Sequence, residues 1–264
     1  MMTPETNRCT LDVHDLDAFY DQLWNQASHG AQDDVEQSRR QVILRLMEEY
    51  VLPSFGVENS LRILDLGCGR GWLTNILSHY GYAVGIDPVQ SAIKRARESF
   101  PALEFRVGIA KDFFRMNEGT DQFELIVSTE VIEHIVDDEK QDFLTNIHSL
   151  LVPRGFAILT TPRGELWTAW KRLGIKEQPI EQWIGEASLD QLSRSVGFQV
   201  VAKDRAFLPK FSYNWISHLA TSRFLRLLMK HFPRSRLLAK LRYYCGIYQV
   251  ILLRKCAELI NGLS

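Results

Sequence analysis

The chain has 264 residues, a hydrophobic content of 45% and a formal net charge of −1 at pH 7. This length suits one α/β domain with additions, and the apolar share is enough to build a sizeable core. A nearly neutral balance does not by itself indicate a polyanionic partner. We find no signal peptide and no run of about 18 apolar residues, the length that a membrane span needs, so a cytoplasmic protein is expected.

Cysteine usage points to the same compartment. The four cysteines form no C-x-x-C pair, and they are Cys9, Cys68, Cys245 and Cys256. Scattered thiols of this kind are typical of a reducing environment.

Residues 1–60 are predicted to form an N-terminal helical segment. Apolar residues recur at helical spacing from Leu16 to Trp24, and again from Val35 to Tyr50 after a polar break at 28–34. Two helices are therefore expected. Pro53, Gly56 and Asn59 then mark a loop that leads into the first strand.

The most informative stretch begins at Leu61. A buried strand over 62–66 leads into the glycine-rich turn 67–71, which is followed by a helix to about Tyr80 and a second strand that ends at Asp87. Glycines in such a turn let a ligand approach the main chain, and the free amides at the start of the helix can bind it. Asp87 follows Asp65 by 22 residues. An acid at about this distance can reach the hydroxyl pair of a ribose.

Strand and helix patterns then alternate along the chain. Further strands are predicted at 104–108, 123–128, 156–160, 198–202 and 248–253, and further helices at 91–99, 140–151 and 189–196, with a turn at Pro153 and Gly155. This alternation predicts an α/β fold with a doubly wound, seven-stranded, mostly parallel sheet. Ligands of such sheets bind beyond the carboxyl ends of the strands, where Asp87, Ala110, Glu130 and Thr161 would gather.

The turn LDLGCGRG followed by GIDP resembles the cofactor loop of class I S-adenosylmethionine-dependent methyltransferases. The resemblance implies a Rossmann-like methyltransferase domain over 61–264, S-adenosylmethionine as methyl donor and S-adenosylhomocysteine as product. In this family the N-terminal helices commonly lie over the cofactor pocket; the alternative is that they only cover one end of the sheet. The last strand would be antiparallel, beside the sixth.

The same resemblance assigns the cofactor site. Asp65 would approach the amino group, the turn would hold the methionine part, Asp87 would hold the ribose, and the chain after Gly108 would meet the adenine. Ile109 stands where many relatives carry an acid, and Asp112 is a candidate substitute. The predicted cofactor-binding residues are Asp65, Gly67, Cys68, Gly69, Gly71, Asp87, Pro88, Ala110, Lys111, Thr129 and Glu130.

The segment EVIEH supplies the candidate chemistry. Glu130, Glu133 and His134 would share one face if this segment is helical, as a base or as a metal site. The segment resembles ubiquinone-biosynthesis O-methyltransferases and small-RNA terminal 2′-O-methyltransferases. The RNA branch adds a histidine where Trp183 or its neighbour stands here, so a divalent metal is not expected and no metal ligand is assigned. We predict that His134 is the catalytic base and that Glu133 orients it.

Two further segments bear on the acceptor. A lid-like segment at 164–185 carries Trp167, Trp170 and Trp183, and in quinone-type relatives this stretch covers the acceptor. A basic helical insertion at 207–245 precedes the last strand; residues 203–242 hold ten Lys or Arg against one acid. The insertion is either a solvated face, a surface for anionic lipid, or a nucleic-acid surface, and the last has no recognised RNA module to support it.

The sequence predicts transfer of methyl to an oxygen of a small-molecule or lipid-linked acceptor, by a cytoplasmic protein that can contact a membrane peripherally through the insertion. Nucleic acid is not the expected partner. The alternatives are an N-methyltransferase of a small amine, a metal-dependent RNA 2′-O-methyltransferase, and a cofactor-binding partner subunit without catalysis of its own.

Overall fold

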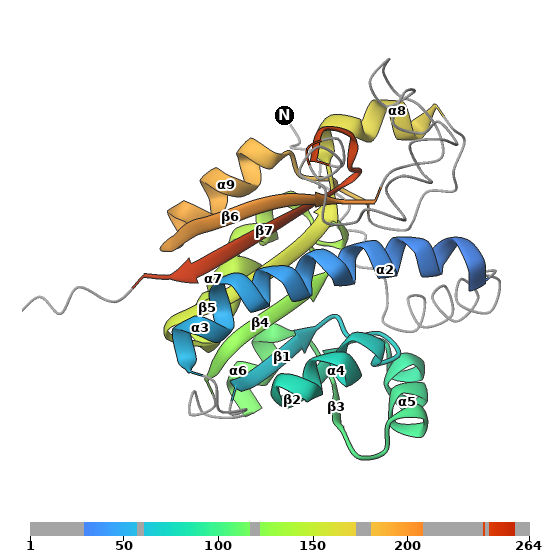
Figure 1. Cartoon of the computed structure of the whole chain (residues 1–264), viewed down its shortest axis with the longest axis vertical. Coiled ribbons are helices and arrows are strands. Elements are labelled where there is room, and N and C mark those ends of the chain that lie inside the picture. The colour runs from blue at the N-terminus through green and yellow to red at the C-terminus, as the bar shows by residue number, and fades with distance from the viewer. Residues whose placement is uncertain are drawn as a thin grey trace, which may run out of the picture.

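The structure is a computed structural model, and it describes residues 29–56, 61–116, 122–172, 181–207, 240 and 243–256. Its strands form one seven-stranded sheet in the order β3-β2-β1-β4-β5-β7-β6, in which only β7 pairs antiparallel with its neighbours (Figure 1). The strands are β1 Leu61–Leu66, β2 Gly81–Asp87, β3 Glu104–Val107, β4 Phe123–Thr129, β5 Leu151–Pro162, β6 Phe198–Ala206 and β7 Tyr248–Lys255. The predicted fold class is confirmed, including the antiparallel last strand.

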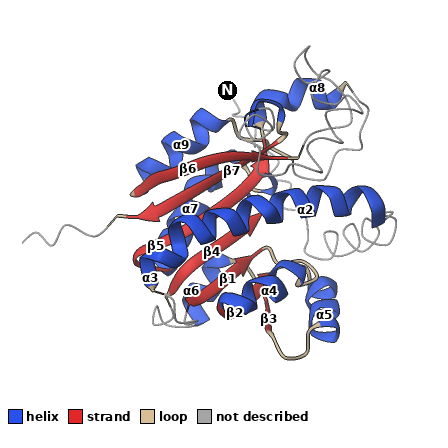
Figure 2. Cartoon of the chain, in the orientation of Figure 1, coloured by secondary structure: helices blue, strands red, loops and turns tan. Residues whose placement is uncertain are grey.

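Helices cover both faces of the sheet (Figure 2). They are α2 His29–Leu46, α3 Leu52–Phe55, α4 Trp72–Leu77, α5 Gln90–Ser99, α6 Ala110–Met116, α7 Lys140–Leu150, α8 Trp167–Lys171 and α9 Glu186–Ser195. Within the ranges given above, no helix is both long enough and apolar enough to cross a bilayer.

Successive side chains of each strand alternate between the two faces of the sheet, and they form one large hydrophobic core on each face. Leu64 on β1 faces the core that α6, α7 and α9 cover, whereas its neighbour Ile63 faces the core that α2 and α4 cover. Since successive side chains of a strand point to opposite faces, a strand that is apolar throughout needs helices on both sides. The apolar runs in the sequence therefore predict the doubly wound arrangement correctly.

The N-terminal helix differs from the prediction. α2 begins at His29, inside the stretch 28–34 that we predicted to be a polar break. A polar helical turn carries no apolar periodicity, so the sequence pattern detects only the later turns, which pack. A π-helical turn over Met47–Val51 links α2 to α3, and Pro53 stands in the first turn of α3, where proline is tolerated. The helix predicted at 16–24 lies outside the described residues, as does most of the insertion at 207–245.

The turn predicted at Pro153 and Gly155 is a bulge within β5. Leu151 pairs with Phe123 and Phe156 pairs with Leu125, so β5 carries three more residues than β4 between these pairs. Arg154, in the bulge, has a positive φ of 66°. The local turn signal is thus real, but pairing with β4 continues on both sides of it.

α2 is part of the domain core, because Leu46 is 1% exposed and belongs to the cluster that covers β1, β4 and β5. We expect Leu46→Ala to lower the free energy of unfolding by about 2–5 kcal/mol, the usual cost of a cavity at such a site. Chemical denaturation monitored by circular dichroism measures this change. Arg40→Ala, an exposed position on the same helix, should leave the free energy of unfolding close to that of the wild type. An equally small effect of Leu46→Ala would show that α2 does not contribute to the stability of the core.

Candidate functional site

The glycine turn after β1 is held against the end of β2. The amides of Gly67 and Cys68 both donate to the carbonyl oxygen of Ile86, at 2.8 and 3.1 Å. The amide of Gly69 donates to Asp87 Oδ2 and that of Val89 to Asp87 Oδ1, each at 2.9 Å. Two backbone amides therefore fix the Asp87 carboxylate at the edge of the turn, where the sequence predicts the ribose contact.

Asp65 lies beneath the turn with no solvent exposure. Its Oδ2 accepts a hydrogen bond of 2.6 Å from Thr74 Oγ1, while its Oδ1 has no hydrogen-bond partner in the described part of the chain. Burial, aided by the nearby charge of Asp87, raises the pKa of Asp65 to about 7. A buried carboxyl oxygen without a donor is what an ammonium group would satisfy, so the site fits the amino group of the expected cofactor.

Two glycines are needed for the shape of the turn. Gly67 and Gly71 both have φ of +81°, a conformation that disfavours side chains. A Cβ on Gly67 would overlap Val131 Cγ2, and one on Gly71 would lie 2.6 Å from the Phe105 ring. The turn is therefore packed against the residue that follows Glu130, which brings the cofactor loop and the EVIEH segment together.

The remaining predicted cofactor residues have different exposures. The Cys68 side chain is buried against Ile93, Ala96 and Phe105, and its Sγ lies 3.9 Å from the Gly69 carbonyl oxygen. Ala110 is 3% exposed at the start of α6, Lys111 beside it is exposed, and Pro88 and Thr129 are half-buried at the ends of β2 and β4. The Gly108 amide donates to the Asp87 carbonyl oxygen at 3.1 Å, which joins the segment predicted to meet the adenine to the residue predicted to hold the ribose.

Glu130 is held in a conformation unusual for a non-glycine residue, with φ of 57°. Its amide donates to the Thr160 carbonyl oxygen, and its Oε1 accepts from Thr160 Oγ1, both at 3.0 Å. Arg39 Nη1 of α2 pairs with the same Oε1 at 3.0 Å, and the guanidinium lies 5.1 Å from the centre of the Tyr248 ring. Contacts from β5 and α2 thus compensate for a strain of about 1–3 kcal/mol.

Glu133 is 3% exposed and accepts a hydrogen bond of 2.9 Å from Thr161 Oγ1. Burial, together with the charge of Glu130, raises the pKa of Glu133 well above its usual range. A carboxyl in this environment favours its neutral form. His134 follows in a single 3₁₀ turn, Ile132–His134, and is half-buried.

Glu130, Glu133 and His134 do not share one helical face. Glu130 precedes the 3₁₀ turn in a left-handed conformation, and its carboxylate meets Arg39 while that of Glu133 meets Thr161. In the described ranges no group of three His, Cys, Asp or Glu side chains is arranged to hold a metal ion. The predicted roles of His134 and Glu133 in catalysis stay predictions.

Sequence reasoning did not assign a role to Arg39 or Tyr248. Burial by itself would lower the pKa of Arg39, but the charge and hydrogen bond of Glu130, together with Tyr248 and Glu36, outweigh it and raise this pKa. Burial, with Glu130 nearby, also raises the pKa of Tyr248. The sequence did contain a signal that Arg39 has a buried partner. Arg39 lies on the apolar face of its helix with Val42, Ile43 and Leu46. A charged residue on such a face needs a buried partner.

A family model described as "Methyltransferase domain" matches residues 33–203, more than half of the chain. The chain belongs to this methyltransferase family. Its predicted membership of the class I fold is confirmed. The matched range contains the glycine turn, both aspartates and the EVIEH segment.

Curated relatives of this methyltransferase include enzymes of ubiquinone biosynthesis. It is 33% identical over 129 residues to the ubiquinone biosynthesis O-methyltransferase of Bradyrhizobium diazoefficiens, a match that covers 47% of this chain and 48% of the relative. It is 39% identical over 109 residues to the mitochondrial ubiquinone biosynthesis O-methyltransferase of Homo sapiens, covering 38% of this chain and 28% of the relative. The match thus spans less than half the length of these two relatives.

Solved structures support the fold. The magnesium protoporphyrin IX methyltransferase of Synechocystis with bound S-adenosylhomocysteine superposes with a TM-score of 0.59 at 14% identity, over 90% of this chain and 94% of that one. A Haloferax volcanii methyltransferase complex with the Trm112 activator gives a TM-score of 0.61 at 15% identity, over 90% and 96%. At such identities the likeness concerns the fold alone.

The raised pKa of Asp65 predicts pH-dependent cofactor binding. An ammonium group binds the ionised carboxylate, so the dissociation constant of S-adenosylhomocysteine should fall about tenfold per pH unit as pH rises toward 7, and level off above it. This pH range lies below the usual pKa of an α-amino group, about 7.7–8.0, so the amino group of the ligand stays protonated throughout. Titration calorimetry between pH 5.5 and 7.5 measures this. Asp65→Asn should bind weakly at every pH, and a flat wild-type profile would contradict the assignment.

The contact between Gly67 and Val131 predicts a compensating pair of substitutions. Gly67→Ala should weaken S-adenosylhomocysteine binding at least tenfold, because the new methyl group overlaps Val131 and the positive φ disfavours it. Adding Val131→Ala removes the overlap but not the backbone strain, so it should restore binding in part. Calorimetry on the wild type, both single variants and the double variant separates the two effects. Strictly additive losses would exclude direct contact as the cause.

Proposed function

We propose that this methyltransferase transfers the methyl group of S-adenosylmethionine to an oxygen atom of a small-molecule or lipid-linked acceptor. The observation that carries the donor assignment is the unpartnered Oδ1 of buried Asp65 beneath the glycine turn. Transfer to oxygen is supported by the ubiquinone biosynthesis O-methyltransferases at 33% and 39% identity.

The residues at the carboxyl ends of the strands take the following roles in this proposal. Asp65 receives the amino group of the cofactor, and Asp87, fixed by the amides of Gly69 and Val89, receives the ribose hydroxyls. Ala110 and Lys111 flank the adenine. The positions match the carboxyl ends of β1, β2 and β3, where ligands of doubly wound sheets bind.

Methyl transfer is an in-line displacement, so its nucleophile has to be held about 3 Å from the methyl carbon. The acceptor hydroxyl must also lose its proton. Glu133 is poorly suited to take it, because the carboxyl is buried and favours its neutral form. Imidazole accepts protons near neutral pH, and we assign that role to half-buried His134, one residue further on.

The acceptor side carries aromatic side chains. Trp183 lies with its ring centre 5.1 Å from that of Trp167 and 5.4 Å from that of Trp170. All three are half-buried, and a partly exposed aromatic cluster suits a flat or apolar acceptor. Peripheral membrane contact through the insertion at 207–245 stays a proposal, because most of that segment lies outside the described residues.

The proposal is tested with a dihydroxybenzene that carries a short isoprenoid tail, in the presence of S-adenosylmethionine. Wild-type protein should methylate a ring hydroxyl. His134→Ala should lower kcat about 10²–10⁴-fold, the usual contribution of a general base, while S-adenosylhomocysteine affinity changes by no more than a few-fold. Product is followed by mass spectrometry and binding by calorimetry.

His79→Ala is the matched control, since His79 is exposed and its ring nitrogen meets only nearby helix carbonyl groups in the contacts described. It should retain wild-type turnover. Full activity of His134→Ala would remove His134 from the chemistry. Loss of turnover in excess EDTA would instead favour the metal-dependent alternative.

A further inference from the structure

Residues 181–186, which we call the strap, cross the rim of the sheet between the EVIEH segment and the end of β5. The amide of Gln182 donates to the Glu133 carbonyl oxygen at 2.7 Å. Further along, the carbonyl oxygen of Ile184 accepts from the Gly164 amide at 3.1 Å and from Gln249 Nε2 at 2.7 Å. The strap also carries Trp183, so its position affects where this ring lies relative to His134.

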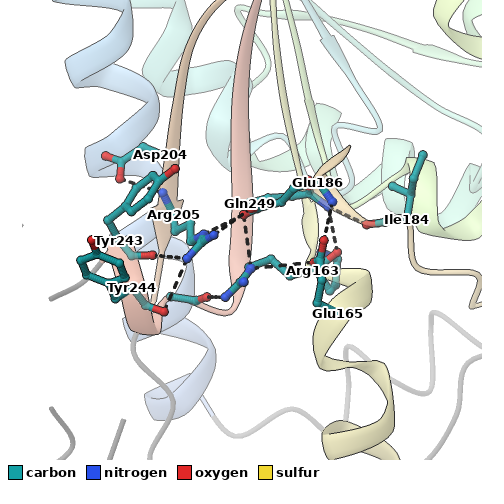
Figure 3. A network of polar contacts seen from close by, with 11 residues as sticks. Arg163, Glu165, Ile184, Glu186, Asp204, Arg205, Tyr243, Tyr244 and Gln249 are labelled. Carbon is teal, nitrogen blue, oxygen red and sulfur yellow. Dashed lines mark hydrogen bonds and ion pairs between the residues drawn. The ribbon is translucent and has the colours of Figure 1, made fainter. Parts of the chain in front are cut away.

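The downstream end of the strap is fixed by two arginines (Figure 3). Arg205 binds both carboxylate oxygens of Glu186, at 2.6 and 2.7 Å, and Arg163 Nε lies 3.2 Å from the first of them. The same arginines donate to the carbonyl oxygens of Tyr243 and Gly246, at 2.6 and 3.1 Å. Although partial burial would raise the pKa of Glu186, these cations lower it. This end is therefore tied to β5, β6 and the chain before β7.

The upstream end is held by hydrogen bonds, one of which comes from a buried charged side chain. Lys140, the first residue of α7, is only 1% exposed, and its Nζ donates to the Gln182 carbonyl oxygen and to Asp137 Oδ1, both at 2.5 Å. The Gln182 side chain adds a hydrogen bond of 2.8 Å from the Asp137 amide to its Oε1. Gln182 itself is exposed, so little packing holds it in place.

We infer that Lys140 is a positioning residue for the methyl acceptor, acting through the strap and resting on the proposed function above. Its ammonium group is enclosed and already bonded, so it does not contact the acceptor itself. Burying an ammonium group costs several kcal/mol unless it is paired. The groups that compensate for this cost are the strap carbonyl group and Asp137, which follows the EVIEH segment. Lys140 thereby fixes the distance between His134 and Trp183.

The test compares Lys140→Met with Lys203→Met. Methionine keeps most of the length of the side chain and removes its charge. The partner carboxylate of Asp137 is exposed, so the substitution leaves no charge buried without a partner. Lys203 is an exposed lysine paired with Asp190 at 2.8 Å, and it lies near Glu186, at the opposite end of the strap from the one that Lys140 contacts. With the isoprenoid-tailed dihydroxybenzene, Lys140→Met should raise the acceptor KM about tenfold, with kcat within about threefold and S-adenosylhomocysteine affinity unchanged. Lys203→Met should match wild type.

A second readout does not depend on turnover. Amide hydrogen exchange at Gln182 should become at least tenfold faster in Lys140→Met, while the amides of β1 and β4 keep their wild-type rates. Asp137→Asn, at an exposed position that cannot threaten the core, should shift both readouts in the same direction by a smaller factor. Unchanged exchange at Gln182 would overturn the inference by itself.

The outcomes separate the inference from the proposed function. If wild type binds S-adenosylhomocysteine but does not methylate the probe, the proposed acceptor class fails, and the exchange rates still decide whether Lys140 holds the strap. If Lys140→Met lowers kcat, cofactor affinity and melting temperature together, the residue has a general structural role and the positioning role is excluded. A rise in acceptor KM alone supports the inference.

Discussion

The buried carboxyl group of Asp65 is the constraint on which the site depends. A carboxyl without solvent exposure is costly to ionise, and Thr74 satisfies only one of its oxygens in the described chain. The structure tolerates this cost because the glycine turn lies directly above, where a positively charged ligand can supply the missing donor. The pKa of this group is raised to about 7, so the proposed role of Asp65 would link cofactor affinity to its charge state.

Contacts of Glu130 and Val131 join the glycine turn to the EVIEH segment. Val131 touches the turn at Gly67, and the preceding residue, Glu130, is held in a left-handed conformation by Thr160 and Arg39. Because Arg39 belongs to α2, the N-terminal helix contributes to the site as well as to the core. That the N-terminal helices lie over the cofactor pocket stays a prediction.

The proposed acceptor side is built from connecting segments, whereas the proposed cofactor side is built from strand ends. The strap reaches the EVIEH segment through the Gln182 amide and reaches α7 through Lys140. Glu186 and Gln249 connect it to the end of β5, to β6 and to β7. Connections vary more readily than sheet strands, because fewer core contacts depend on them. One fold can thus keep a common methyl donor site while its acceptor site changes.

The sequence by itself determined the strand and helix segments, the glycine turn and the spacing of Asp65 and Asp87, because each depends on residues close together in the chain. It could not determine where α2 begins, since a polar helical turn has no apolar period. Nor could it bring Arg39 to Glu130, or Lys140 to Gln182. Those partners are distant in sequence, and only the packing of helices on the finished sheet decides which buried charge meets which carbonyl or carboxylate group.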